Sequence, residues 1–176
     1  MDRVRSSLDA ATGVRYNVFE DTLPEPTSQS VEQSIAALRK GMPGSFSHSY
    51  LTASSLGEKY DCIIALGGGS PIDTAKMAAV LHTHGGTVLD YRPPFRMDEA
   101  ALPVIAVPTT AGTGSEATQF TVITDSATGE KVSCGGLGFM PAAAVVDYEL
   151  TLSKPWRLSA DTGIDALCHA MEAFVR

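Results

Sequence analysis

The sequence has only three cysteines in 176 residues, Cys62, Cys134 and Cys168, and none of them share a CxxC spacing. An odd number of scattered cysteines argues against a disulfide framework and against a thiolate zinc site. We therefore expect reduced thiols that pack as small hydrophobic side chains.

Long hydrophobic runs are also missing. The sequence contains no stretch of about 18 uninterrupted apolar residues, and polar residues follow Met1 where a signal peptide needs an apolar block. These two absences predict a chain without a membrane span, and the default expectation is a cytoplasmic location.

Basic residues are too few to favour nucleic-acid binding. The chain has 13 Lys and Arg against 20 Asp and Glu, a net charge of −7, and no cluster of Lys or Arg. Such a balance repels a polyphosphate backbone. Because 44% of the residues are hydrophobic, the chain can build one globular core. A small-molecule partner is the better expectation.

Strand and helix patterns alternate along the chain. Strands are expected at residues 14–19, 62–66, 103–107 and 142–146, a hairpin at 121–124 and 131–133, and helices at 28–40, from Ser70 to about Leu81, and from about Ser159 onward. Residues 41–55, which include Pro43, Gly44 and several serines, have no period and are expected to form a loop. This order predicts an α/β fold with a Rossmann-like, mainly parallel sheet and helices on both faces.

The triplet Gly67-Gly68-Gly69 follows a buried strand and is followed by Ser70 and Pro71. Ser70 is a good N-cap, with Pro71 at the first helical position and Asp73 three residues after the cap. Glycines let a phosphate approach the backbone, and the N-terminal end of a helix stabilises negative charge. The loop is therefore a plausible diphosphate cradle, although a tight turn with no ligand would also select glycines.

A second loop, rich in glycine and hydroxyl groups, follows the strand at 103–107. Thr109, Thr110 and Thr113 can offer hydroxyls to a ligand at the carboxyl edge of the sheet, where open α/β sheets bind ligands. The same hydroxyls could instead cap a turn. Two such loops at one edge strengthen the prediction of a nucleotide site.

The last helix carries a possible metal-binding pair. Asp165 and His169 are four residues apart, so both lie on one helix face and can reach one divalent cation. An ion pair on a helix surface is the competing interpretation, and two ligands fall short of a tight site. Asp147 follows the strand at 142–146 and could orient a site or cap a turn.

Three segments together resemble the signature segments of the iron-dependent (group III) alcohol dehydrogenases. They are GGGSPIDTAK at residues 67–76, PTTAGTGSE at 108–116 and GIDALCHAME at 163–172. The resemblance implies an NAD(P)-dependent alcohol or aldehyde oxidoreductase with a divalent metal, usually Fe²⁺ and sometimes Zn²⁺ or another ion. It also implies a homo-oligomer for the full-length protein.

The resemblance also assigns roles by position. Gly68, Gly69 and Ser70 would hold the diphosphate, and Asp165 and His169 would be two of four metal ligands. The remaining cofactor contacts that it implies are Thr109, Thr110, Thr113, Thr118 and Lys131. In such a site the metal would polarise the substrate oxygen while hydride passes to or from the nicotinamide.

The chain departs from this family in two places. We expect a partial chain that lacks the first nucleotide-binding strand and most of the helical domain, with an NAD(P)-binding domain at 1–155 and the start of a metal-binding helical domain at 156–176. Such a fragment is expected to be inactive alone.

The open alternatives are a hydroxyacid–oxoacid transhydrogenase or a maleylacetate-type reductase on the same scaffold, and a non-catalytic nucleotide-binding remnant. Finding the rest of the reading frame in the neighbouring DNA would separate the remnant from the enzymes.

Overall fold

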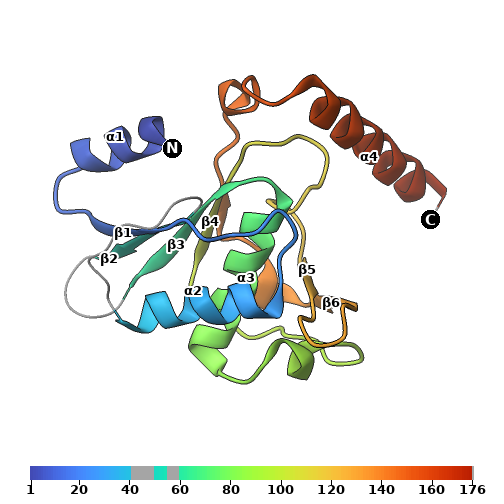
Figure 1. The fold of residues 1–176 in the computed structure, drawn as a ribbon, viewed down its shortest axis with the longest axis horizontal. Helices are drawn as coiled ribbons and strands as arrows, with labels where there is room; N and C mark the ends of the chain where they lie inside the picture. The colour runs from blue at the N-terminus through green and yellow to red at the C-terminus, as the bar shows by residue number, and fades with distance from the viewer. Residues whose placement is uncertain (41–49, 55–59, 176) are drawn as a thin grey trace.

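A computed structural model describes residues 1–40, 50–54 and 60–175 (Figure 1). Its helices and strands follow each other along the chain in the order α1 (Asp2–Ala10), β1 (Arg15–Phe19), α2 (Ser28–Lys40), β2 (Tyr50–Ser54), β3 (Cys62–Gly67), α3 (Gly69–His84), η1 (Val88–Tyr91), β4 (Val104–Pro108), β5 (Phe120–Thr124), β6 (Lys131–Gly135), η2 (Leu137–Phe139), β7 (Ala143–Ala144), η3 (Tyr148–Thr151) and α4 (Trp156–Val175). None of the described helices is both long and apolar enough to span a membrane.

The main sheet has the strand order β1-β2-β3-β4-β7. β3, β4 and β7 pair in parallel, whereas β2 pairs antiparallel with both of its neighbours, so β1 again points the same way as β3. Four of the five strands therefore have their carboxyl ends at one edge. The predicted α/β fold with a mainly parallel sheet is confirmed.

The expected loop at residues 41–55 is partly wrong. Residues 50–54 form strand β2, which pairs with β1 on one side and β3 on the other. The rest of that range lies outside the described residues. A pattern of neighbouring residues cannot reveal this strand because its stability comes from hydrogen bonds to two distant partners, and tertiary pairing overrides local preference.

Helices lie on both faces of the sheet, as predicted. On one face α2 and α3 enclose the larger core cluster, in which Val31, Ile72 and Val80 are fully buried. The smaller cluster on the other face contains Ile64, Leu66 and Val107, and residues of α1 pack against it. Figure 1 shows α1 and α2 at separate sides of the strands. The sequence pattern did not predict α1.

The predicted hairpin is confirmed as the antiparallel pair β5–β6. It lies next to α3, where Thr121 Oγ1 donates to the Asp73 carbonyl over 2.8 Å and the Val122 N–H donates to Asp73 Oδ2 over 3.0 Å. The hairpin is therefore fastened to the helix that follows the glycine loop.

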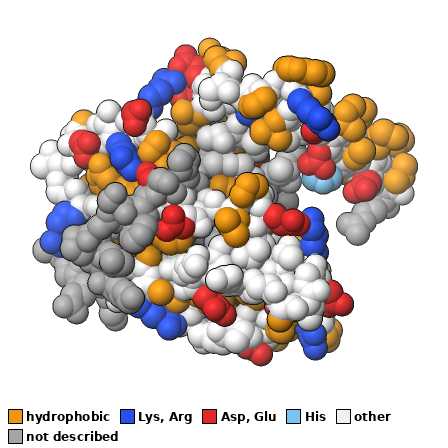
Figure 2. All heavy atoms as spheres, viewed as in Figure 1, with side chains coloured by type: hydrophobic (Ala, Val, Ile, Leu, Met, Phe, Trp, Pro, Cys, Tyr) orange, Lys and Arg blue, Asp and Glu red, His pale blue; other side chains and the backbone are white. Residues whose placement is uncertain are grey.

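Helix α4 extends away from the sheet, and Thr162 is its only buried residue among those described. Its expected apolar stripe is exposed: Ile164 is 61% accessible, Met171 60% and Phe174 91%. Hydrophobic side chains accordingly gather along the right-hand arm of the surface in Figure 2. An exposed patch of this kind favours self-association or a covering partner.

Candidate functional site

The glycine loop begins where β3 ends. Gly67 has φ +150°, and a Cβ there would lie 2.6 Å from Pro71 Cγ, so the turn requires glycine. The Thr109 N–H donates to the Gly67 carbonyl over 2.8 Å, which joins this turn to the end of β4. Helix α3 then starts at Gly69, and the N–H groups of its first turn have no partner within the helix.

The threonine loop packs directly against these glycines. A Cβ on Gly68 would lie 3.1 Å from Thr110 Cγ2, and one on Gly69 would lie 3.2 Å from Thr113 Cγ2. The two loops predicted from the sequence are therefore brought together at the carboxyl edge of the sheet. Such close approach leaves the backbone, rather than side chains, to face a ligand.

Thr110 Oγ1 is a buried hydroxyl for which no hydrogen-bond partner exists among the residues that the structure describes. Leaving such a group unsatisfied costs about 1–3 kcal/mol. Thr113 Oγ1, by contrast, accepts from the Ser115 N–H over 3.3 Å. An unpaired hydroxyl beside Gly68 fits a bound polar ligand, and a nucleotide phosphate or ribose has the acceptors and donors to satisfy it.

The predicted N-cap role of Ser70 is wrong. The N-cap is Gly68, with no side-chain cap, and Ser70 lies inside the first turn of α3. Its hydroxyl donates instead to the Pro24 carbonyl, from the segment between β1 and α2. Asp73 does not close a capping box either, because its Oδ2 accepts from Val122 N–H in β5. Distant partners have replaced the local ones.

The two outlying cofactor candidates make different contacts. Thr118 Oγ1 accepts from Lys76 Nζ over 3.2 Å. Lys131 lies on the exposed hairpin and forms an ion pair with Glu25 over 2.8 Å, and this hydrogen bond lowers the pKa of the Glu25 carboxyl. The predicted roles of Ser70, Thr118 and Lys131 toward a nucleotide stay predictions.

Lys76 is the residue near this site that sequence reasoning missed. It is only 1% exposed, although lysine is rarely buried unless paired. Burial lowers its pKa to about 8, while the charges of Asp73 and Glu116 act in the opposite direction. Burial also raises the pKa of Asp73, an effect that the Val122 N–H partly offsets. The signal was an isolated acidic and basic residue inside an otherwise apolar helix.

Asp165 and His169 lie on the same face of α4, as predicted. His169 Nε2 is 3.8 Å from Asp165 Oδ1, and both side chains are about half exposed. A carboxylate oxygen and an imidazole nitrogen suit a first-row divalent metal. Within residues 1–40, 50–54 and 60–175, no group of three or more His, Cys, Asp or Glu side chains gathers to complete such a site.

Helix α4 meets the threonine loop at Gly112. Gly112 has φ +144°, and a Cβ there would lie 2.0 Å from the Thr162 carbonyl oxygen. Lys154 Nζ also donates to Thr162 Oγ1 over 3.2 Å. Asp165 follows Thr162 by about one helical turn, so the candidate metal ligands begin next to the candidate nucleotide loops. Asp147, in turn, caps a turn by accepting from the Glu149 N–H over 3.0 Å.

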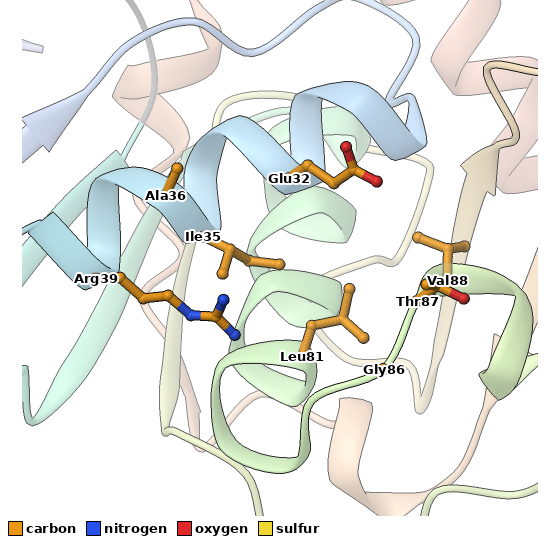
Figure 3. A pocket seen from close by; sticks show the side chains of 8 residues that line it. All are labelled: Glu32, Ile35, Ala36, Arg39, Leu81, Gly86, Thr87 and Val88. Atoms are coloured by element: carbon orange, nitrogen blue, oxygen red, sulfur yellow. The ribbon is translucent and has the colours of Figure 1, made fainter.

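Two cavities lie beside α2. One, of about 470 Å³, opens after the carboxyl end of β1 and is lined by residues between Glu20 and Gln33. The other, of about 360 Å³, lies between α2 and the end of α3, over Ile35, Leu81 and Val88 (Figure 3). The second cavity is at the opposite end of α3 from the glycine loop, so it is separate from the candidate nucleotide site.

The chain is similar in sequence to known alcohol dehydrogenases. It is 39% identical over 178 residues to long-chain-alcohol dehydrogenase 1 of Geobacillus thermodenitrificans, an alignment that covers 99% of this chain and 40% of that protein. It is 35% identical to the NAD-dependent methanol dehydrogenase of Bacillus methanolicus, with 93% and 38% covered. The chain thus spans about two fifths of the length of these relatives.

Solved structures show the same fold. The iron-containing alcohol dehydrogenase of Thermotoga maritima superposes with a TM-score of 0.78 at 32% identity, covering 98% of this chain and 42% of that one. Sulfoacetaldehyde reductase from Bifidobacterium kashiwanohense in complex with NAD⁺ gives 0.76 at 34% identity, covering 93% and 39%. A family model for iron-containing alcohol dehydrogenases matches residues 1–148. The chain therefore belongs to the iron-containing alcohol dehydrogenase family.

Proposed function

We propose that this chain is the nucleotide-binding part of an oxidoreductase that transfers hydride between a small alcohol or aldehyde and NAD or NADP. One observation carries the proposal: the glycine loop packs against the threonine loop at the carboxyl edge of the sheet, beside the unpaired hydroxyl of Thr110. The names of its relatives, an NAD-dependent methanol dehydrogenase among them, support this substrate and cofactor class.

Each part of the site has a proposed task. The backbone of Gly68 and Gly69 and the first N–H groups of α3 bind the diphosphate, because positive dipole ends stabilise anions. Thr109, Thr110, Thr113 and Thr118 line the nucleotide, and Ser70 and Lys131 complete its contacts. These groups orient the nicotinamide ring, and correct orientation can supply much of a rate enhancement.

Asp165 and His169 would hold a divalent metal, with iron as the ion for which the family is named. A metal bound there supplies Lewis-acid polarisation of the substrate oxygen. In alcohol oxidation the carbon gives a hydride to the nicotinamide and the hydroxyl gives a proton to solvent. We further propose a domain boundary between residues 155 and 156. The NAD(P)-binding domain lies before it, and the metal-binding helical domain begins after it. A homo-oligomeric, cytoplasmic protein stays a prediction from the sequence.

Replacing Gly68 with valine should weaken NADH binding by about 1–3 kcal/mol, the usual cost of overpacking. Gly68 has a negative φ of −80°, and a Cβ there would lie 3.1 Å from Thr110 Cγ2, so the valine side chain crowds the cradle between the two loops. Fluorescence titration with NADH measures the change. Gly163→Val on the exposed surface of α4, where a Cβ meets nothing within 4 Å, is the matched control. Equal affinity of wild type and Gly68→Val would reject the nucleotide site.

The 176-residue chain should retain less than one equivalent of Fe²⁺ or Zn²⁺ after dialysis and should not oxidise alcohols. Asp165 and His169 provide two ligands, whereas a catalytic divalent site ordinarily has at least three protein ligands. Metal analysis of the dialysed protein, together with an assay of a primary alcohol and NAD⁺, tests this. A monodisperse monomer with stoichiometric metal and turnover would show that other residues of the chain complete the site.

A further inference from the structure

All the hydrogen bonds of the buried Lys76 ammonium group go to one short segment of the chain, Thr118 to Phe120. Lys76 Nζ donates to the Thr118 carbonyl over 2.9 Å, to Thr118 Oγ1 over 3.2 Å and to the Phe120 carbonyl over 2.9 Å. An ammonium group has three donors, and three acceptors satisfy them here. Lys76 therefore has no donor left to reach a phosphate.

The same segment is fastened to α3 a second time. Thr121 Oγ1 donates to the Asp73 carbonyl, and the Val122 N–H donates to Asp73 Oδ2. Asp73 and Lys76 lie in the first two turns of α3, directly after the glycine loop at Gly68 and Gly69. The helix that would carry the diphosphate and the segment that begins at Thr118 are thus held together by buried polar contacts.

We infer that Lys76 is a positioning residue. It fixes the segment from Thr118 to Phe120 against α3, and so it sets the distance between this segment and the glycine loop of the nucleotide site. The inference rests on the proposed nucleotide binding. It assigns Lys76 no contact with the cofactor. Hydrogen bonds from a charged donor are roughly twice as strong as neutral ones. Removing this donor takes such a bond from two carbonyls and leaves that of Phe120 with a 3.4 Å hydrogen bond from Thr118 Oγ1.

The charge of Lys76 makes the arrangement sensitive to pH. The charged groups that face it are Asp73 on α3 and Glu116 in the threonine loop. Burial lowers the pKa of Lys76 from 10.5 to about 8, so above that pH the attached amine is neutral. Detachment would return the amine to water and to its ordinary pKa, so between pH 8 and pH 10.5 detachment takes up a proton and becomes less favourable as the pH rises.

The test compares the wild-type chain, Lys76→Met and a matched control, Lys154→Met, whose ammonium group donates to Thr162 Oγ1 on α4. In Lys76→Met, amide hydrogen exchange at residues 118–122 should be at least about 10-fold faster than in wild type, and the NADH dissociation constant should rise at least about 10-fold. Between pH 8 and pH 10, exchange at residues 118–122 in wild type should slow relative to the intrinsic rate, and this dependence should vanish in Lys76→Met. Lys154→Met should behave as wild type in both measurements.

Unchanged exchange at 118–122 and an unchanged NADH affinity in Lys76→Met would overturn the inference. If wild type binds no NADH, the proposed function fails, and the exchange rates alone then decide whether Lys76 fixes the segment. Should Lys76→Met not fold, the pH dependence of exchange at 118–122 in wild type provides the same test without a variant. Slowing above pH 8 relative to the intrinsic rate would support the anchor, and a profile that only follows the intrinsic exchange rate would overturn it.

Discussion

Gly136→Ala is expected to lower the free energy of unfolding by about 3 kcal/mol, the sum of backbone strain and overpacking. Gly136 has φ +140°, a conformation that residues with a Cβ rarely adopt, and a Cβ there would lie 2.2 Å from the Met97 carbonyl oxygen. That carbonyl accepts from the Gly138 N–H over 2.8 Å, and the Met97 side chain is buried in the core. Neither backbone segment can move aside without breaking contacts.

Urea denaturation of the two proteins measures this loss. Gly129→Ala is the matched control, since Gly129 also has a positive φ of +74° but a Cβ there meets nothing within 4 Å. The free energy of unfolding of the control should fall by only about 1 kcal/mol, the cost of backbone strain alone. Equal losses in the two variants would show that the approach of Met97 to Gly136 contributes nothing to stability.

Alkaline pH should destabilise the fold through Cys134, by about 2–3 kcal/mol between pH 9 and pH 11. Cys134 is 0% exposed, and burial raises the pKa of its thiol from 9.0 to about 11. In that window the unfolded chain has lost the thiol proton and the folded chain has kept it. Folding therefore binds a proton, and stability that is fully present below pH 9 falls as the pH rises through 11.

The free energy of unfolding of wild type and Cys134→Ala, measured by urea denaturation from pH 7 to pH 11, isolates this effect. Lys76 titrates in both proteins and acts with the opposite sign. Its folded pKa of about 8 lies below the ordinary 10.5, so the unfolded chain binds more protons between these values and stability rises. The difference between the two proteins should shrink or reverse above pH 9. Parallel curves would exclude the thiol as the cause.

Local signals were sufficient where a structure depends on neighbours in the chain. The turn at Gly67 arises from adjacent residues, because the backbone angles and the close Pro71 ring both demand glycine at that position. The apolar stripe along one face of α4 was predictable for the same reason, since residues at helical spacing share one face whatever surrounds them. Asp165 and His169 accordingly lie on one face, 3.8 Å apart.

The meeting of the two ligand loops was half predictable. Parallel strands end at the same edge of a sheet, so loops that follow β3 and β4 were expected to be neighbours. The contact of Gly68 with Thr110, and the burial of the Thr110 hydroxyl, depend on the pairing of the two strands in one register. No pattern within either loop contains that register.

Composition, periodicity and the three motifs determined the fold class, the family and the identity of most candidate site residues, because these depend on residue type and short-range spacing. Tertiary structure alone decided the partners of Ser70 and Lys76, which bond to Pro24 and to Thr118 from elements 42 or more residues away. It also decided the strand at Tyr50–Ser54 and the approach of Gly112 to Thr162. The physical reason is common to all of these. A hydroxyl, an ammonium group or a strand edge takes whichever partner the packed fold brings within reach, and spacing along the chain does not encode that partner.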